Sequence, residues 1–219
     1  MSERLPGDPA EVAEAEEEES GSFAEGAPAS GPAPEEADSE VSMLRTDDEL
    51  QEDQHAYGEL DVPDDVNVIE GHPDGARRGV AIVASRYNGE ITNRLLDSAL
   101  SELDASGVRR EAVTVMPVPG AFELPLAAMA LAKTRRYACV VALGCVVRGE
   151  TPHFEFIASE AASGLQLAAL ETGVPVAFGV LTVDMVEQAE ARVSKGAEAV
   201  RTALEMADAF AQLRASAGR

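Results

Sequence analysis

The segment Arg148–His153 (RGETPH) holds the side chains best suited to chemistry in this sequence. Thr151 is placed to cap the amino end of a helix, with Pro152 as its first residue. Such a helix end presents free N–H groups that suit a phosphate. His153 falls in the same turn, and because histidine titrates near neutral pH, it could transfer protons to a bound ligand. The structural alternative is a surface histidine beside a capped helix.

The segment Ser85–Asn88 (SRYN) offers an aromatic ring beside an amide. Tyr87 could present a stacking face to a heterocycle. In the structural alternative, Tyr87 packs at the rim of the core and Asn88 caps the following helix.

The segment 117–125 (PVPGAFELP) forms a turn that prolines fix, and Gly120 would let a ligand approach the backbone. Glu123 falls in the first turn of the next helix, where it could contact a ligand. It could equally be a favourable charge on the helix dipole. Further along, Phe178 and Arg192 taken alone favour a core aromatic and a solvated charge.

Several kinds of site find no support in the sequence. Neither a GxGxxG nor a GxxxxGK[ST] fingerprint occurs, and there is no Gly-x-Ser-x-Gly elbow. Three histidines and two isolated cysteines make no metal cluster, so we expect no metal. The region after residue 75 has no basic excess, which argues against nucleic acid. No run of about 18 apolar residues predicts a membrane span.

Apolar strands alternate with helical patterns from residue 80 onward, and this order predicts a parallel sheet covered by helices on both faces. The fold class is therefore three-layer α/β/α with a four-stranded parallel sheet. Ligands of such sheets bind beyond the carboxyl ends of the strands. The expected strands are 80–85, 112–118, 138–147 and 176–182. The expected helices are 88–106, 121–134, 152–172, 184–193 and 195–213.

Residues 1–65 have the composition of a disordered acidic tail, which leaves 66–219 as the folded domain. The first 75 residues contain 24 acidic residues and two arginines, whereas the remainder is close to neutral. Cys139 and Cys145 fall on one face of one strand, so we expect two reduced core thiols. With no signal-peptide pattern, we expect a cytoplasmic protein.

Taken together, the segments resemble the lumazine synthase family over residues 66 to about 213. The resemblance rests on VNVIEG, SRYN, VPGAFELP, LGCVVRGETPHFEF, TGVPVAFGVLT and EQAEAR, in the family's order. It implies a flavodoxin-like fold and a transferase without a cofactor. The implied reaction joins 5-amino-6-(D-ribitylamino)uracil to 3,4-dihydroxy-2-butanone 4-phosphate. The products are 6,7-dimethyl-8-ribityllumazine, phosphate and water, in the penultimate step of riboflavin biosynthesis.

The resemblance also implies a role for each site residue. Tyr87 would stack on the pyrimidine, and Phe178 would close that pocket. His153 would be the proton donor, and Arg192 would pair with phosphate. The remaining positions would bind the ribityl-amine portion (Ala121, Phe122 and Glu123), the pyrimidine edge (Cys145, Val146 and Val147) and the sugar phosphate (Glu150 and Thr151).

The family forms pentamers, some of which build icosahedral shells. The resemblance would also allow an association with riboflavin synthase. The run Val66–Glu70 resembles a first strand that pairs with a neighbour's sheet. Three departures are visible: Tyr87 in place of a common Phe, Cys145 in place of a frequent Thr, and a short link between Arg192 and Lys195. The short link is the feature that favours the alternative function, a lumazine- or flavin-binding or shell-forming protein without catalysis.

Overall fold

Four parallel strands form the centre of the structure, in the order β2-β1-β3-β4. The inner strands are β1 (Val80–Ser85) and β3 (Cys139–Val147), and the outer ones are β2 (Val113–Val118) and β4 (Val176–Val183). The inner strands are buried along almost their whole length. Their continuous apolar sequences fit this environment, because helices cover both faces of a parallel sheet. The predicted three-layer α/β/α class is confirmed.

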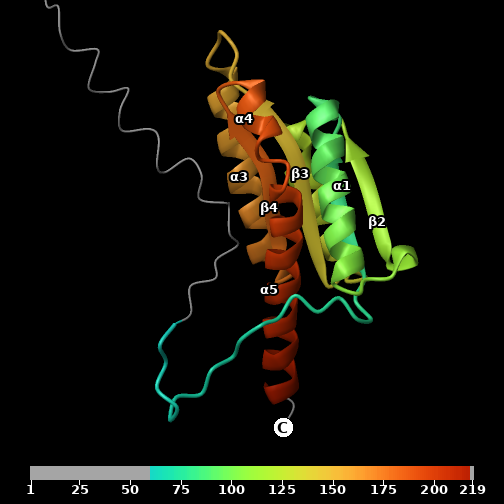
Figure 1. Ribbon diagram of the computed structural model, residues 1–219, viewed down its shortest axis with the longest axis vertical. Coiled ribbons are helices and arrows are strands. Elements are labelled where there is room, and N and C mark those ends of the chain that lie inside the picture. Colours follow the sequence, from blue (N-terminus) through green and yellow to red (C-terminus); the bar gives the residue numbers. More distant parts are fainter. Residues whose placement is uncertain (1–59, 218–219) are drawn as a thin grey trace, which may run out of the picture. The chain divides into compact units, whose positions relative to one another are not determined.

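This computed structural model describes residues 60–217, all within one compact unit, Gln51–Arg219 (Figure 1). Of the disordered tail predicted over residues 1–65, residues 1–59 lie outside the described residues. Among the helices that the structure describes, none is long and apolar enough to cross a membrane.

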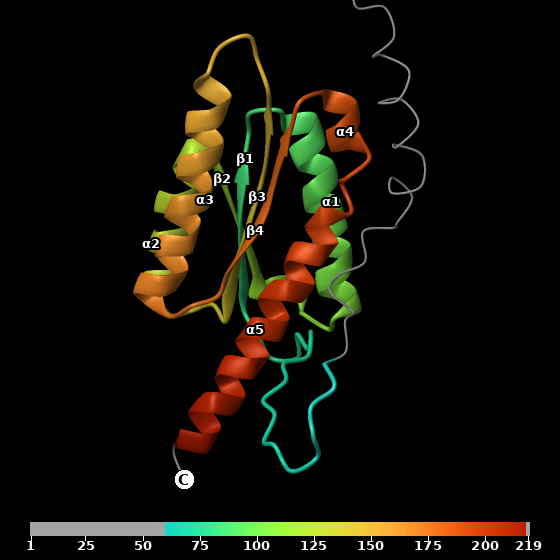
Figure 2. The same ribbon diagram turned by 90° about the vertical axis from the view of Figure 1, so that its left-hand side faces the viewer.

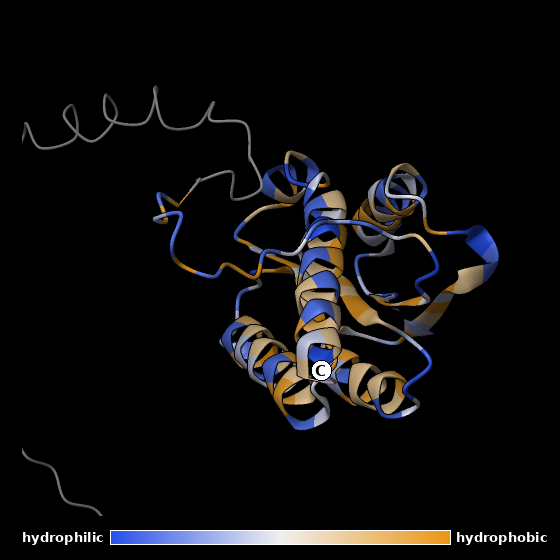
Figure 3. Cartoon of the chain, turned by 90° about the horizontal axis from the view of Figure 1, so that it is seen from below, coloured by the Kyte–Doolittle hydropathy of each residue, from blue (hydrophilic) through white to orange (hydrophobic). Residues whose placement is uncertain are grey.

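Helices cover the two faces of the sheet unequally, as Figure 2 shows. The helices α2 (Leu124–Lys133) and α3 (His153–Thr172) lie on one face. The other face carries α1 (Gly89–Ala105), α4 (Val186–Glu190) and α5 (Lys195–Ala217). Alternate residues of each inner strand enter the two cores, as strand geometry requires. Coloured by hydropathy, the strands are predominantly hydrophobic, whereas the helices carry both kinds of residue (Figure 3).

Two predicted helices differ from the structure. The helix expected from Ala121 begins as a 3₁₀ turn, Ala121–Glu123, before α2 starts at Leu124. The helix expected over 184–193 is only the short α4, because Ala189 is the single residue that it buries. The other boundaries agree within a few residues, which is the usual uncertainty at helix ends.

The run Val66–Glu70, predicted to be β-prone, pairs with no described strand of its own subunit. Its chain passes close to α5, where the Gln212 side-chain amide donates to the Glu70 carbonyl at 2.6 Å. A Cβ on Gly71 would lie 2.0 Å from the Glu205 carbonyl oxygen, so only glycine allows this approach. The side chains of Val66, Val68 and Ile69 nevertheless remain exposed.

Candidate functional site

The loops that follow the strands meet at the carboxyl edge of the sheet. The ladder pairs Ser85 with Val118, and Val147 with Val183, so neighbouring strands end close together. After β1 the chain enters α1 on one face, and after β3 it enters α3 on the opposite face (Figure 2). The gap between the ends of β1 and β3 is therefore the switch point at which sheets of this kind bind ligands.

Tyr87 lies at this edge with its side chain open to solvent. The residue is 75% exposed, so the interpretation of Tyr87 as a cap on the core rim is wrong for this subunit. Backbone bonds fix its position: the Arg86 N–H donates to Val118 at 2.8 Å, and the Tyr87 N–H donates to Pro119 at 3.1 Å. These bonds join the loop after β1 to the loop after β2.

Asn88 occupies the N-cap position of α1, but its side chain makes no capping bond. Its backbone is left-handed, with φ 54° and ψ 44°, a conformation that asparagine tolerates better than most residues. The side-chain amide instead donates to the Cys145 carbonyl at 2.9 Å. The proposed cap is thus wrong, and Asn88 connects the loop after β1 to the end of β3.

The turn after β2 is held by Glu123. Its Oε2 accepts a hydrogen bond from the Gly120 N–H at 2.9 Å, which supports the structural interpretation of this carboxylate. The Oε1 atom makes no hydrogen bond with the described residues and can accept one from a ligand. Phe122 is exposed and Ala121 is buried, so the turn offers an aromatic face beside a carboxylate oxygen.

The end of β3 contributes backbone groups to the candidate site more than side chains. Cys145 and Val146 are buried, and Val147 is partly buried. Burial raises the pKa of the Cys145 thiol, and it raises the pKa of Cys139 to about 12. Both thiols are free and lie on the same side of β3, as predicted. Since the thiolate is the reactive form, neither cysteine is suited to act as a nucleophile near neutral pH.

The loop between β3 and α3 exposes Glu150, Thr151 and His153 to solvent. Pro152, with φ −63° and ψ −2°, is the N-cap of α3, and His153 is the first helical residue. The predicted cap by Thr151 is wrong, because the helix starts one residue later and has no side-chain cap. The first N–H groups of α3 and the Thr151 hydroxyl are consequently available to an anion.

Phe178 and Arg192 lie elsewhere, in a groove along the edge strand β4. Phe178 is 46% exposed, so the prediction of a core aromatic is wrong for the single subunit. It pairs with Ala142 at mid-strand, five residues before Val183 and about 16 Å from the carboxyl edge at 3.3 Å per residue. Arg192 follows α4 and donates to the Gln188 carbonyl at 3.0 Å. Within one chain, Phe178 is therefore remote from the predicted site residues of the carboxyl edge, and Arg192 lines the same groove as Phe178.

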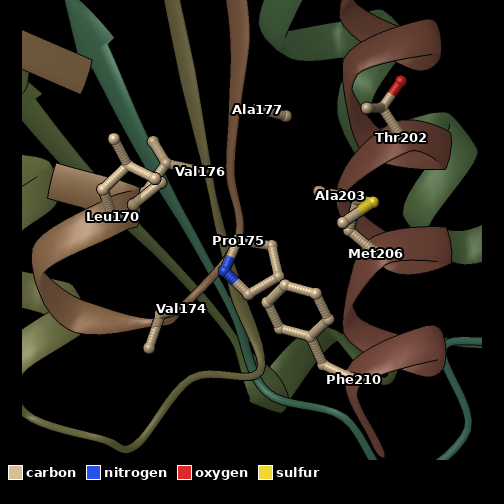
Figure 4. Close-up of a pocket in the computed structure, with 10 residues that line it drawn as sticks. Leu170, Val174, Pro175, Val176, Ala177, Thr202, Ala203, Met206 and Phe210 are labelled. Carbon is tan, nitrogen blue, oxygen red and sulfur yellow. The ribbon is translucent and has the colours of Figure 1, made fainter. Parts of the chain in front are cut away.

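A second groove, near the amino end of β4, has an apolar lining that is not suited to catalysis. Figure 4 shows that it lies between the start of β4 and α5, with apolar side chains around it. Thr202 supplies the one hydroxyl group among its lining side chains, and no charged side chain lines it. The lining residues are Ala169, Leu170, Val174, Pro175, Val176, Ala177, Thr202, Ala203, Met206 and Phe210.

Sequence reasoning missed three residues that hold these loops. It assigned Asn88 to a cap, and it gave no role to Arg148 or Asp184, which form an ion pair between the loops after β3 and β4. The sequence signal for this ion pair is a cation directly after one buried strand and a carboxylate directly after the next strand. Within residues 60–217, no group of three His, Cys, Asp or Glu side chains could hold a metal ion.

Comparison with known proteins identifies close relatives of this chain. The sequence model of the 6,7-dimethyl-8-ribityllumazine synthase family matches residues 78–211. The 6,7-dimethyl-8-ribityllumazine synthase of Syntrophus aciditrophicus (strain SB) is 48% identical over 144 residues, which cover 64% of this chain and 92% of the relative. The protein of the same name from Yersinia pestis (strain Pestoides F) is 51% identical over 147 residues, which cover 64% of this chain and 94% of the relative.

Proposed function

The chain belongs to the 6,7-dimethyl-8-ribityllumazine synthase family, and we propose that it performs the family's reaction at the carboxyl edge of its sheet, in sites shared by neighbouring subunits. As a transferase of riboflavin biosynthesis, it joins 5-amino-6-(D-ribitylamino)uracil to 3,4-dihydroxy-2-butanone 4-phosphate. The amine condenses with the ketone to an imine with loss of water, phosphate is eliminated, and ring closure with loss of a second water gives the lumazine.

In the proposed pyrimidine pocket, the exposed ring of Tyr87 stacks on the heterocycle. The backbone at Cys145, Val146 and Val147 faces the edge of the pyrimidine, and a side chain cannot change the hydrogen-bonding pattern of that backbone. This explains why a cysteine is acceptable at position 145. The ribityl chain, which is rich in hydroxyl groups, suits the unbonded Oε1 of Glu123 and the turn that contains Ala121 and Phe122.

The phosphate end of the proposed site is the loop before α3. The uncapped helix terminus and the Thr151 hydroxyl provide donors, and Glu150 belongs to the same loop. His153 lies in the first turn of α3, where it can donate a proton to the departing phosphate or take one from the condensing amine. Proximity of the two bound reactants supplies a large part of the rate, because amine and ketone condense readily once they are aligned.

The separation of Phe178 from this edge is the observation that carries the proposal of a shared site, and Arg192 lines the same groove as Phe178. A mid-strand aromatic about 16 Å from the carboxyl edge cannot close a pocket there in its own subunit. In a ring of identical subunits, each chain gives one surface and receives another, so Phe178 and Arg192 would complete the neighbour's site. Arg192 and Lys195 line one groove, so the short link between them keeps both cations together.

We propose a homopentamer, which can assemble further into an icosahedral shell and associate with riboflavin synthase. Two features support assembly. The exposed apolar side chains of Val66, Val68 and Ile69 lack a partner strand within the described subunit. The edge strand β2 also exposes Val115 and Met116. An edge strand with exposed apolar residues is a template for pairing with another chain. The reduced state of both buried thiols supports a cytoplasmic location.

The direct test is to mix the purified full chain with both substrates and record the absorbance and green fluorescence of the lumazine together with phosphate release. Equal amounts of lumazine and phosphate are expected. Binding of the lumazine without any turnover would contradict catalysis and leave a binding protein on the same fold.

A further inference from the structure

Arg148, the first residue after β3, makes contacts with two other segments of the carboxyl edge. Its Nε donates to Asp184 Oδ1 at 2.6 Å, and its Nη1 donates to Glu155 Oε1 at 3.3 Å. The guanidinium also lies over the ring of Phe154, 4.4 Å from the centroid. Its backbone N–H donates to the Val183 carbonyl at 2.9 Å. One side chain therefore joins the end of β3, the start of α3 and the residue that follows β4.

These contacts enclose the loop that carries the proposed phosphate-binding residues. Arg148 stands before the loop, and Phe154 and Glu155 stand after it, so the arginine holds both ends. Within the described residues, the side chains of Glu150, Thr151 and His153 make no hydrogen bond of their own. A Cβ added to Gly149 would meet nothing within 4 Å, so packing does not fix the loop there. Arg148 is consequently the principal side-chain anchor of this loop.

The electrostatics favour an anchor over a direct phosphate ligand. Hydrogen bonds to Asp184 and then Glu155 raise the pKa of the Arg148 guanidinium. One cation shared by two carboxylates leaves a local charge that is negative, which would oppose an incoming phosphate. The planar fork of arginine can serve two carboxylates and stack on a ring at once, whereas the ammonium of lysine acts as a point charge.

We propose that Arg148 is a positioning residue for the sugar phosphate: through Asp184, Glu155 and Phe154 it holds the Glu150–His153 loop in its binding conformation. This inference rests on the proposed function, because it names the loop that binds the substrate phosphate. Since all the ion pairs are exposed, each is weak, and we expect a moderate effect.

The test compares Arg148→Lys, Asp184→Ala and the double variant in the full-length assembled protein. Glu187→Ala is the matched control, because Glu187 is an exposed carboxylate of α4 that makes no ion pair with the described residues. Steady-state assays give KM for each substrate and kcat. Asp184→Ala, which removes one exposed ion pair, should raise KM for the sugar phosphate by roughly three- to fivefold, and Arg148→Lys, which also weakens the contact with Phe154, by roughly five- to tenfold. KM for the pyrimidine, kcat and the control should stay within about twofold.

The double variant distinguishes positioning from direct binding. If Arg148 acts through Asp184, the double variant should be no worse than the more affected single variant, because both remove one interaction. If Arg148→Lys weakens binding of the sugar phosphate while Asp184→Ala behaves like the wild type, the Arg148–Asp184 pair does not hold the loop and the proposal is wrong. Unchanged KM in both single variants would also overturn it.

A second measurement does not depend on turnover. A glutamate-specific protease can cleave after Glu150, and cleavage should be several-fold faster in Arg148→Lys and Asp184→Ala than in the wild type or Glu187→Ala. Faster cleavage in a chain without synthase activity would support the anchor while the proposed function fails. Equal cleavage in all four proteins, with an active wild type, would reject the anchor and leave the function intact.

Discussion

Two inactive variants should restore each other's activity if neighbouring subunits share the site. Glu123→Lys removes the carboxylate at the turn before α2. Arg192→Glu replaces a cation of the β4 groove with a negative charge that repels phosphate. Phe178, in the same groove as Arg192, lies about 16 Å from the carboxyl edge. We therefore expect each site to take Glu123 from one chain and Arg192 from its neighbour.

The size of the rescue follows from random assembly. In an equal mixture, half of the chains supply an intact Glu123 and half supply an intact Arg192, so about one interface in four combines both. Unfolding the two variants together and refolding the mixture should return roughly a quarter of the wild-type lumazine formation. Each variant refolded alone should stay near background.

Two controls make the outcome decisive. Either variant refolded with an equal amount of wild type should give roughly half the wild-type activity under either arrangement, which shows that refolding in a mixture returns active sites. Mass spectrometry of the intact assemblies confirms the mixing. If these controls behave as expected and the mixture of the two variants is inactive, the site lies within one subunit, and the placement of Arg192 in its neighbour's pocket is wrong.

Four further outcomes are expected. His153→Ala should lower kcat towards the smaller end of the ~10²–10⁴-fold range of acid–base groups, and wild-type turnover would remove it from catalysis. A chain starting at Asp65 should keep turnover within a few-fold, because no proposed site residue precedes it; a hundredfold loss would contradict this. Asn88→Gly and Asn88→Ala both lose the hydrogen bond to Cys145, but only glycine adopts the left-handed backbone without strain. Asn88→Ala should therefore be the less stable of the two by about 1 kcal/mol in urea unfolding. Burial raises the pKa of the Cys139 thiol to about 12 in the folded state. The contribution of Cys139 to the free energy of unfolding is therefore complete below pH 9. It is lost as the pH rises from 9 towards 12, by up to about 1.4 kcal/mol per pH unit. Unfolding titrations at pH 8, 9 and 10 should show this slope in the wild type and a weaker one in Cys139→Ala.

The strands were predictable because burial on both faces leaves a direct mark in the sequence. The runs at 80–85 and 139–147 are almost wholly apolar, and they are the two central strands. Boundaries were less predictable where a single residue decides them. Thr151 has the right type for a cap, but Pro152 adopts helical angles one residue later, and Asn88 uses its amide across the sheet. At Asn88, local preference gave way to a tertiary contact with Cys145.

The candidate residues after β1, β2 and β3 could be found from the sequence, because parallel strands bring their carboxyl ends to one edge. What the sequence by itself determined is thus the α/β order, the buried strands, the family and the identity of the reactive loops. Only the tertiary structure decided that Tyr87 and Phe178 face solvent, that Phe178 lies far from the carboxyl edge, and that Arg148 joins three segments. The physical reason is that a sequence pattern reports which face of an element is buried, whereas exposure at an edge strand and contacts between loops depend on how distant elements are arranged in space.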